Sequence, residues 1–371
     1  MGGREGHAVI AADVANAAGR LKRDSPEARR ASRGPESARV LALNIFLFLQ
    51  NRCLNEALAP QITAGIQPQM LAGIGFDGRL QPVTLPSADS KLESAEAPTY
   101  NVGKFPIGIT FDGIYIWVAN GGSNAVTKLQ ASDGAVVGTF NVGKFPIGVA
   151  FDGLNIWVAN GESNNLMKLR ASDGAMLGTF NVGTKPAMVA FDGANIWVAN
   201  ENSDNVMKLR ASDGAVLGTF SVEKNPVGVV FDGTNIWVVN RDSNTVSKLR
   251  AGDGAVLGSF RVGRVPLSVA YDGANIWVTN SESDSVTKLR AIDGAVLGNF
   301  NVGKVPGGVA FDGTNIWVTN EESNNVMKMR ASDDAVLDTF IVGTLPLQVA
   351  FDGANIWVTN GRSDRVSKLK R

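Results

Sequence analysis

The stretch "NVGTKPAMVAFDGANIWVANENSDNVMKLRASDGAVLGTF", residues 181–220, decides the fold. Close variants of it follow one another from Leu92 to Arg371, a length of seven times 40 residues. One tryptophan marks each copy, and the chain has no others: Trp117, Trp157, Trp197, Trp237, Trp277, Trp317 and Trp357. A fixed period of this length is typical of repeat proteins, in which each unit buries its faces against its neighbours.

Four short apolar runs alternate with turn signals inside one unit. In the quoted copy the runs are "PAMVAF", "NIWVAN", "NVMKLR" and "AVLGTFSV". The Asp-Gly pairs in "DGAN" and "SDGA" predict tight hairpin turns after the first and the third run. Ile196, Trp197 and Val198 are consecutive and apolar, which predicts a strand buried on both faces. A four-stranded meander buried on both faces must lie between other sheets, so each unit predicts one propeller blade.

The count of strands predicts how the ring closes. The chain ends after the third predicted strand of the seventh unit. The segment "APTYNVG", residues 97–103, aligns with "LGTFNVG" of the fourth strands, so we expect it to complete the last blade. Closure would remove two unpaired sheet edges. The sequence thus predicts an all-β fold, a seven-bladed β-propeller of four-stranded antiparallel blades at residues 92–371, closed by an N-terminal strand.

The region before the repeats divides into three parts. Residues 1–39 are rich in arginine and small residues and predict a disordered tail. Residues 40–60 contain "VLALNIFLFL", an apolar run too short to span a bilayer. It fits a signal peptide with "ALA" as the cleavage site, a buried or capping helix, or an extension from a misassigned start codon. Residues 61–91 predict a linker. Export, to the periplasm or the medium, is slightly favoured over a cytoplasmic location.

Composition excludes several function classes. The chain has 35 basic and 35 acidic residues, which gives no electrostatic reason to expect nucleic acid or an anionic membrane as partner. The single histidine, His7, and the single cysteine, Cys53, both precede the repeats. The ring therefore lacks the imidazole that usually activates a serine. We predict no catalytic residue, no metal ligand, no cofactor and no integral membrane span, and we expect a monomer.

The repeat "IWVTN..S..V.KL....GAVLGTF.VG..P..VAFDG" closely resembles the YVTN family of propeller repeats, with tryptophan in place of the name-giving tyrosine. It is also similar to the NHL repeat. The resemblance covers residues 92–371 and implies a propeller. Related propellers include virginiamycin-lyase-like enzymes and gluconolactonase-like hydrolases. The lyase type uses histidines with a carboxylate and a metal, and no residue of this ring matches those histidines, so the resemblance transfers no catalytic residue.

Three side chains recur in every unit and have ordinary structural interpretations. Each tryptophan stands between isoleucine and valine, which predicts a core position. Each aspartate before a glycine, such as Asp192, stands alone, which predicts a turn instead of a calcium site. Lys128 and its six equivalents alternate with apolar residues, and we expect them on a solvated or salt-bridged outer face.

Two of the four connections vary between copies, while the two Asp-Gly turns hardly change. In a propeller both variable connections emerge on one face, around the mouth of the channel. One hypothesis is that this face carries the partner-specific residues; the alternative is drift in loops that geometry constrains less. The candidate residues are Lys104, Lys144, Glu162, Lys185, Glu201, Lys224, Arg241, Asp242, Arg264, Glu282, Lys304, Glu321, Glu322 and Arg362. In particular, we expect five basic residues to face six acidic ones: Lys104, Lys144, Lys224, Arg264 and Lys304 against Glu162, Glu201, Asp242, Glu282, Glu321 and Glu322.

Near-interchangeable units favour binding over catalysis, because an enzyme needs one acid and one base at unique places. The sequence therefore predicts a non-enzymatic binding or scaffold propeller with a multivalent face at the channel mouth. Its partner would be a protein or a glycan of unknown identity. The alternative is a lyase- or lactonase-like propeller enzyme with a metal in the central channel.

Overall fold

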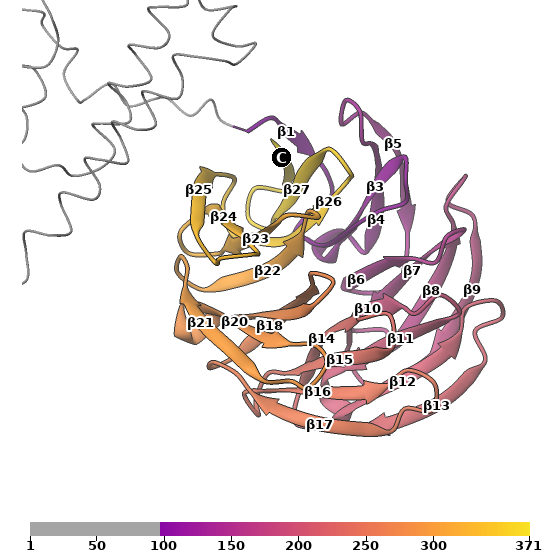
Figure 1. Ribbon diagram of the computed structural model, residues 1–371. Coiled ribbons are helices and arrows are strands. Elements are labelled where there is room, and N and C mark those ends of the chain that lie inside the picture. Colours follow the sequence, from indigo (N-terminus) through magenta and orange to yellow (C-terminus); the bar gives the residue numbers. More distant parts are fainter. Residues whose placement is uncertain (1–96) are drawn as a thin grey trace, which may run out of the picture. The chain divides into compact units, whose positions relative to one another are not determined.

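The computed structural model describes residues 97–371. These residues form seven four-stranded antiparallel sheets, arranged as blades in a ring (Figure 1). The first strand of each sheet packs beside the first strands of the two neighbouring sheets, so these strands surround the centre. The predicted all-β seven-bladed propeller is confirmed. The predictions for residues 1–39, 40–60 and 61–91 lie outside the described residues.

The first four blades follow one another along the chain. Blade 1 contains β2 (Pro106–Phe111), β3 (Tyr115–Asn120), β4 (Ala125–Gln130) and β5 (Val136–Asn141). Blade 2 contains β6 (Pro146–Phe151), β7 (Asn155–Asn160), β8 (Asn165–Arg170) and β9 (Met176–Asn181). Blade 3 contains β10 (Pro186–Phe191), β11 (Asn195–Asn200), β12 (Asn205–Arg210) and β13 (Val216–Ser221). Blade 4 contains β14 (Pro226–Phe231), β15 (Asn235–Asn240), β16 (Thr245–Arg250) and β17 (Val256–Arg261).

The last three blades continue the same order. Blade 5 contains β18 (Pro266–Tyr271), β19 (Asn275–Asn280), β20 (Ser285–Arg290) and β21 (Val296–Asn301). Blade 6 contains β22 (Pro306–Phe311), β23 (Asn315–Asn320), β24 (Asn325–Arg330) and β25 (Val336–Ile341). Blade 7 contains β26 (Pro346–Phe351), β27 (Asn355–Asn360) and β28 (Arg365–Lys370), and its fourth strand is β1 (Thr99–Asn101).

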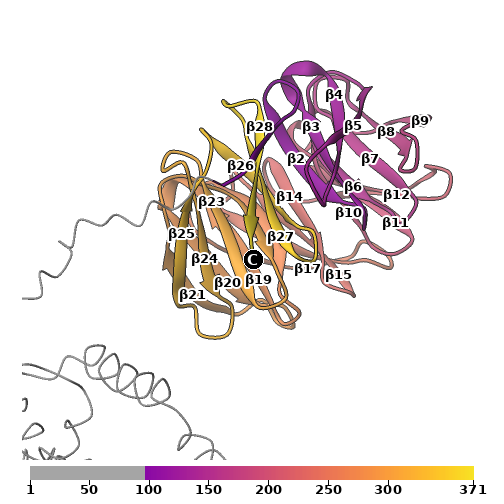
Figure 2. The same cartoon turned by 90° about the horizontal axis from the view of Figure 1, so that it is seen from above.

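The ring is closed by β1, which pairs antiparallel with β28 through Thr99 opposite Ser367 and Asn101 opposite Arg365. Both views place β1 among the strands of the last blade (Figure 1 and Figure 2). The ring centroid of Tyr100 lies 5.5 Å from that of Trp357. In the other blades a phenylalanine of the fourth strand takes this place. The predicted closure by an N-terminal strand is confirmed, and it leaves no open gap between the first and last blades.

The tryptophans form the core between blades, as predicted. Trp197 is fully buried and stacks on Phe220 of its own blade, with ring centroids 5.5 Å apart. On its other side it packs against Ile236 and Val238 of blade 4. Full burial of one such side chain contributes about 1.5–3 kcal/mol. Since each tryptophan contacts two blades, no blade completes its core alone.

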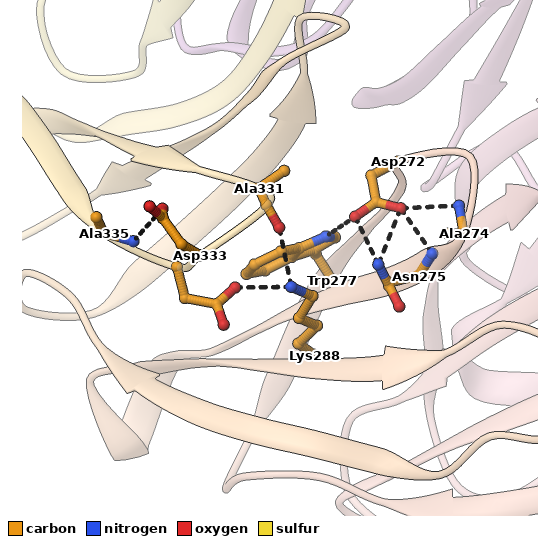
Figure 3. Close-up of polar contacts among 9 residues, drawn as sticks. Asp272, Ala274, Asn275, Trp277, Lys288, Ala331, Asp333 and Ala335 are labelled. Carbon is orange, nitrogen blue, oxygen red and sulfur yellow. Dashed lines mark hydrogen bonds and ion pairs between the residues drawn. The ribbon is translucent and has the colours of Figure 1, made fainter.

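The aspartate of each first turn is confirmed as a turn residue and also holds the tryptophan. In blade 5, Oδ1 of Asp272 accepts the backbone N–H groups of Ala274 and Asn275, and Oδ2 accepts Nε1–H of Trp277 at 2.7 Å (Figure 3). Burial raises the pKa of Asp272, but the hydrogen bonds from Trp277 and Asn275 outweigh it, and the pKa is lowered. The carboxylate therefore satisfies the one polar atom of the buried indole.

The prediction that Lys128 and its equivalents form a solvated or salt-bridged outer face is wrong. Lys208 is 7% exposed, and its Nζ donates to the carbonyl oxygens of Ala251 at 2.6 Å and Gly252 at 3.1 Å. Both acceptors belong to the next blade. Nζ also stands 5.2 Å from the ring centroid of Trp197. Alternation along β12 does place Lys208 on the face opposite Met207 and Leu209, but that face also carries the buried Val206 and meets the neighbouring blade instead of water.

Six junctions of the ring share this lysine contact. The lysines that donate to the next blade are Lys128, Lys168, Lys208, Lys248, Lys288 and Lys368. Lys368 donates to Ala131 and Ser132 of blade 1, so the contact also crosses the point of closure. Lys288 uses Asp334 as its second acceptor, at 2.7 Å. Lys328 makes no such hydrogen bond within residues 97–371, although its Nζ lies 5.0 Å from the ring centroid of Trp317.

Candidate binding site at the channel mouth

The two variable connections of each blade lie on one face and are hydrogen-bonded to each other. In blade 2, Gly161 N donates to Phe145 O at 2.9 Å, and Glu162 N donates to Lys144 O at 3.2 Å. Equivalent bonds join the loops of the other blades. We call this side of the ring the mouth face. The 14 candidate residues of the sequence all lie on these two sets of loops.

A cavity of about 150 Å³ lies at the centre of the mouth face. Every blade lines it with the second residue of its first strand: Ile107, Ile147, Ala187, Val227, Leu267, Gly307 and Leu347. Because all seven blades contribute, this cavity lies on the ring axis. Three charged side chains also line it, namely Glu201, Arg241 and Glu321. We call it the central cavity.

The charged and aliphatic residues of the central cavity exclude each other sterically. A Cβ atom on Gly121 would lie only 2.9 Å from Cδ1 of Ile107, so the isoleucine fills the space above that glycine. Blade 6 reverses the pair, because a Cβ atom on Gly307 would lie 2.6 Å from Oε1 of Glu321. The glutamate therefore occupies the place that an aliphatic side chain takes in blade 1.

The same exchange distinguishes the other blades. Where glycine follows the second strand, the partner on the first strand is large, as in Ile107–Gly121, Ile147–Gly161 and Leu347–Gly361. Where a long polar residue follows it, the partner is smaller, as in Ala187–Glu201, Val227–Arg241 and Gly307–Glu321. Blades 7, 1 and 2 thus present an apolar half of the cavity, and blades 3, 4 and 6 present polar side chains.

The three charged groups differ in how they are compensated. Glu201 is 7% exposed, and its Oε2 lies 2.6 Å from Nζ of Lys185. Nε of Arg241 lies 3.4 Å from Oδ1 of Asp242. Glu321 has no ion pair with any of the described residues. Burial, together with the nearby carboxylate of Glu322, raises the pKa of Glu321 to about 7.

A second cavity of about 430 Å³ adjoins Glu321 between blades 6 and 7. We call it the side cavity. Its walls are Val305, Glu321, Glu322, Asn324, Thr344, Leu345 and Arg362. Glu321 therefore lines both cavities and connects them. Farther round the mouth face, Phe105 and Phe145 stack with centroids 6.2 Å apart, which extends the apolar side.

The expected pairing of basic with acidic candidate residues is only partly observed. Arg264 pairs with Glu282 at 2.5 Å, as expected. Glu201 pairs with Lys185, which was not among the basic residues expected to face it. Lys224 and Lys304 pair instead with Asp204 and Asp284, at 2.7 and 2.5 Å. These two aspartates end the loop of the preceding blade, so the ion pairs cross blade junctions. Lys104, Lys144, Glu162 and Arg362 form no ion pair within the part of the chain that the structure describes.

Sequence reasoning missed Glu223, which stands where the other copies have glycine. Its carboxylate accepts hydrogen bonds from the hydroxyls of Thr245, at 2.7 Å, and Ser259. Burial raises the pKa of Glu223, but the hydrogen bonds from Ser259, Thr245 and Ser243 outweigh it, and the pKa is lowered. The sequence alone could have identified it, because the six equivalent positions of the other copies are all glycine. Glu223 lines neither cavity.

The described side chains do not form a group of ligands that could hold a metal ion. Among residues 97–371, no three His, Cys, Asp or Glu side chains are grouped as metal ligands would be. The same residues contain no helix that is both long and apolar enough to cross a bilayer. The central cavity thus brings together two carboxylates, one guanidinium and a ring of aliphatic carbons, which is a lining suited to binding.

No family model matches the chain, and no curated protein matches it either. Solved structures do share its fold. A streptogramin B lyase structure is 18% identical, with a TM-score of 0.64, over 74% of this chain and 96% of that chain. Hydrazine synthase of Kuenenia stuttgartiensis is 18% identical, with a TM-score of 0.63, over 79% and 99%. Virginiamycin B lyase from Staphylococcus aureus is 16% identical, with a TM-score of 0.65, over 74% and 99%. Identities this low show the fold alone.

Proposed function

We propose that the protein is a non-enzymatic binding propeller of the YVTN type, similar to NHL propellers, with its ligand site at the channel mouth. The observation that carries the proposal is the exchange of aliphatic for charged side chains around the central cavity. A purely structural ring would gain more from seven aliphatic residues there, because even a partly buried charge is costly when nothing compensates it. Blade 6 instead holds Glu321 over Gly307, and no described residue neutralises it.

The exposed loops around the cavity would bind a larger partner. Lys104, Lys144 and Glu162 make no ion pair within residues 97–371 and repeat on loops of the same shape. A repetitive protein or glycan surface could engage several of these loops at once. Weak contacts then add through effective concentration, which is the sense in which the mouth face would be multivalent.

An enzymatic role is the second candidate, and one observation favours it. A carboxyl group with a pKa near 7 is suited to general acid or base catalysis at neutral pH. Glu321, however, has no nucleophile hydrogen-bonded to it among the described residues, and the ring has no histidine. A lyase- or lactonase-like reaction would therefore need a substrate that supplies the remaining groups, and binding remains our proposal.

A swap between blades tests the binding site. The double variant Gly307→Leu/Glu321→Gly gives blade 6 the pair found in blade 7, Leu347 and Gly361. We expect it to fold, because the aliphatic side chain fills the space that the glutamate leaves. The control is Asp338→Asn, which changes an exposed carboxylate on the outermost strand of the same blade.

The readout is binding on a glycan array and in a thermal-shift screen of small molecules. A ligand that binds the wild type and the control but not the swap variant supports the site. A ligand that binds all three equally places binding elsewhere, and a screen without any ligand counts against a binding role.

A further inference from the structure

We infer that the channel mouth binds a small organic cation, whose ammonium group lies against Glu321 and whose apolar body lies against the aliphatic residues of the two cavities. This inference rests on the proposed function, because it names the ligand class of the same site. It follows from the charge, the shape and the connection of the two cavities.

Among the carboxylates that line the central cavity, Glu321 alone has no counter-ion within residues 97–371. Glu201 is paired with Lys185, and Arg241 lies beside Asp242. Lys304, which is on the loop before β22, is held by Asp284 of blade 5 at 2.5 Å. Arg362 shares the side cavity with Glu321 but makes no ion pair with it. A bound cation would supply the missing charge.

The apolar walls lie on both sides of Glu321. The central cavity offers Leu347 and Ile107, and the side cavity offers Val305 and Leu345. The side cavity, at about 430 Å³, falls in the range usual for small-molecule sites. A ligand with one cationic group and a chain or ring of about six carbons would place its charge at the junction and its carbons in either cavity.

Other ligand classes fit this lining less well. An anion would be attracted by Arg362 but would meet two carboxylates, Glu321 and Glu322, in the same cavity, and like charges at close range repel each other. A neutral apolar ligand would remove water from Glu321 without replacing the lost hydration. A cation gains from both carboxylates and leaves the ion pairs of Glu201 and Arg241 undisturbed.

The binding should depend on pH. The titratable and charged groups that face Glu321 are Glu322 on its own loop, Arg362 from blade 7, and Arg241 and Glu201 across the central cavity. Since burial raises the pKa of Glu321 to about 7, the carboxyl is largely protonated at pH 5.5 and ionised at pH 8.5. A cation whose charge is permanent should therefore bind more tightly at the higher pH.

The experiment uses three probes with the same carbon chain: hexyltrimethylammonium, 1-hexanol and hexanoate. Binding to the full chain is measured by titration calorimetry at pH 8.5 and pH 5.5. We expect the ammonium to bind at least tenfold more tightly than the other two at pH 8.5. Its affinity should fall about tenfold in Glu321→Gln, while the control Asp338→Asn stays at the wild-type value.

The outcomes separate the two proposals. A pH effect that persists in Glu321→Gln, or equal affinity for hexanol and the ammonium, overturns the cation inference and leaves a mouth site intact. If none of the probes binds, the cation inference fails, and the blade swap then decides the proposed function alone. Glu321→Asp is the control for misfolding, because it keeps the negative charge. This variant should retain the preference for the ammonium.

Discussion

Nζ of Lys208 lies 2.6 Å from the carbonyl oxygen of Ala251, which belongs to the next blade. Burying an ammonium group is costly, but two backbone carbonyls and the face of Trp197 compensate this one. The contact therefore couples neighbouring blades by a polar bond in addition to apolar packing.

Removal of this lysine should weaken the ring. Lys208→Met keeps most of the side-chain volume but leaves the carbonyls of Ala251 and Gly252 without their donor. We expect a loss of about 1–3 kcal/mol in the free energy of unfolding, measured with urea. Lys328→Met is the matched control, because Lys328 stands over its tryptophan but makes no bond to the next blade within residues 97–371. Equal losses in the two variants would contradict the role of the carbonyl bonds.

Removal of the closing strand should destabilise the whole propeller. Deletion of residues 97–103 exposes the edge of β28 and takes Tyr100 away from Trp357. We expect the free energy of unfolding to fall by several kcal/mol, on the order of 3–5, and the melting temperature to fall with it. Deletion of seven residues at 62–68 controls for the shorter chain. An unchanged melting temperature in the first deletion would contradict closure by β1.

Stability should decrease as the pH rises through neutrality, because of Glu321. Its pKa is raised from 4.5 to about 7 in the folded state, so folding favours the protonated form. The stabilisation is complete below pH 4.5 and is lost as the pH rises through 7. We expect the free energy of unfolding to fall by about 1–2 kcal/mol between pH 5 and pH 8, a figure that allows for the partial exposure of Glu321.

The variant Glu321→Gln should remove this dependence and be more stable than the wild type at pH 8, by urea unfolding. Glu322→Gln should retain a weaker form of the dependence, because one of the two causes of the raised pKa is lost. If the slope between pH 5 and pH 8 is the same in Glu321→Gln as in the wild type, another group is responsible.

The turn aspartates should act in the opposite direction, at acid pH. Burial raises the pKa of Asp272, the bonds from Trp277 and Asn275 outweigh it, and the folded-state pKa lies below 3.8. Its stabilisation is therefore present above pH 3.8 and is lost as the pH falls through the folded value. Asp272→Asn should lower the free energy of unfolding by about 1–3 kcal/mol at pH 7. It should also make that free energy depend less on pH in the acid range. A variant as stable as the wild type would show that the indole bond contributes nothing.

The fold could be predicted from the sequence because its signals are local and repeated. Each signal predicts a feature of one blade or of one junction. These signals are the Asp-Gly turns, the three consecutive apolar residues around each tryptophan, and the additional strand at residues 97–103. Tryptophan burial and turn formation by aspartate followed from the same local pattern.

Contacts between blades could not be predicted in the same way. Alternation along β12 shows that Lys208 and Met207 lie on opposite faces, but not whether water or another blade covers a face. The acceptor, Ala251, is 43 residues away in the chain. The pairing of Lys224 with Asp204 also depends on how two blades are placed. Glu321 was a candidate because its position varies between the copies. Only the structure shows that its side chain fills the space beside Gly307 and lines two cavities.

In the six junctions that have the lysine contact, one acceptor is always the backbone carbonyl of an alanine, which a side-chain substitution does not remove. All seven copies carry the lysine, so most junctions depend little on which two copies meet. A unit inserted by tandem duplication would therefore dock against either neighbour from its first appearance, without waiting for compensating changes. Such interchangeable junctions leave the mouth loops free to diverge one copy at a time, which is the condition for a symmetric ring to acquire a single, asymmetric site.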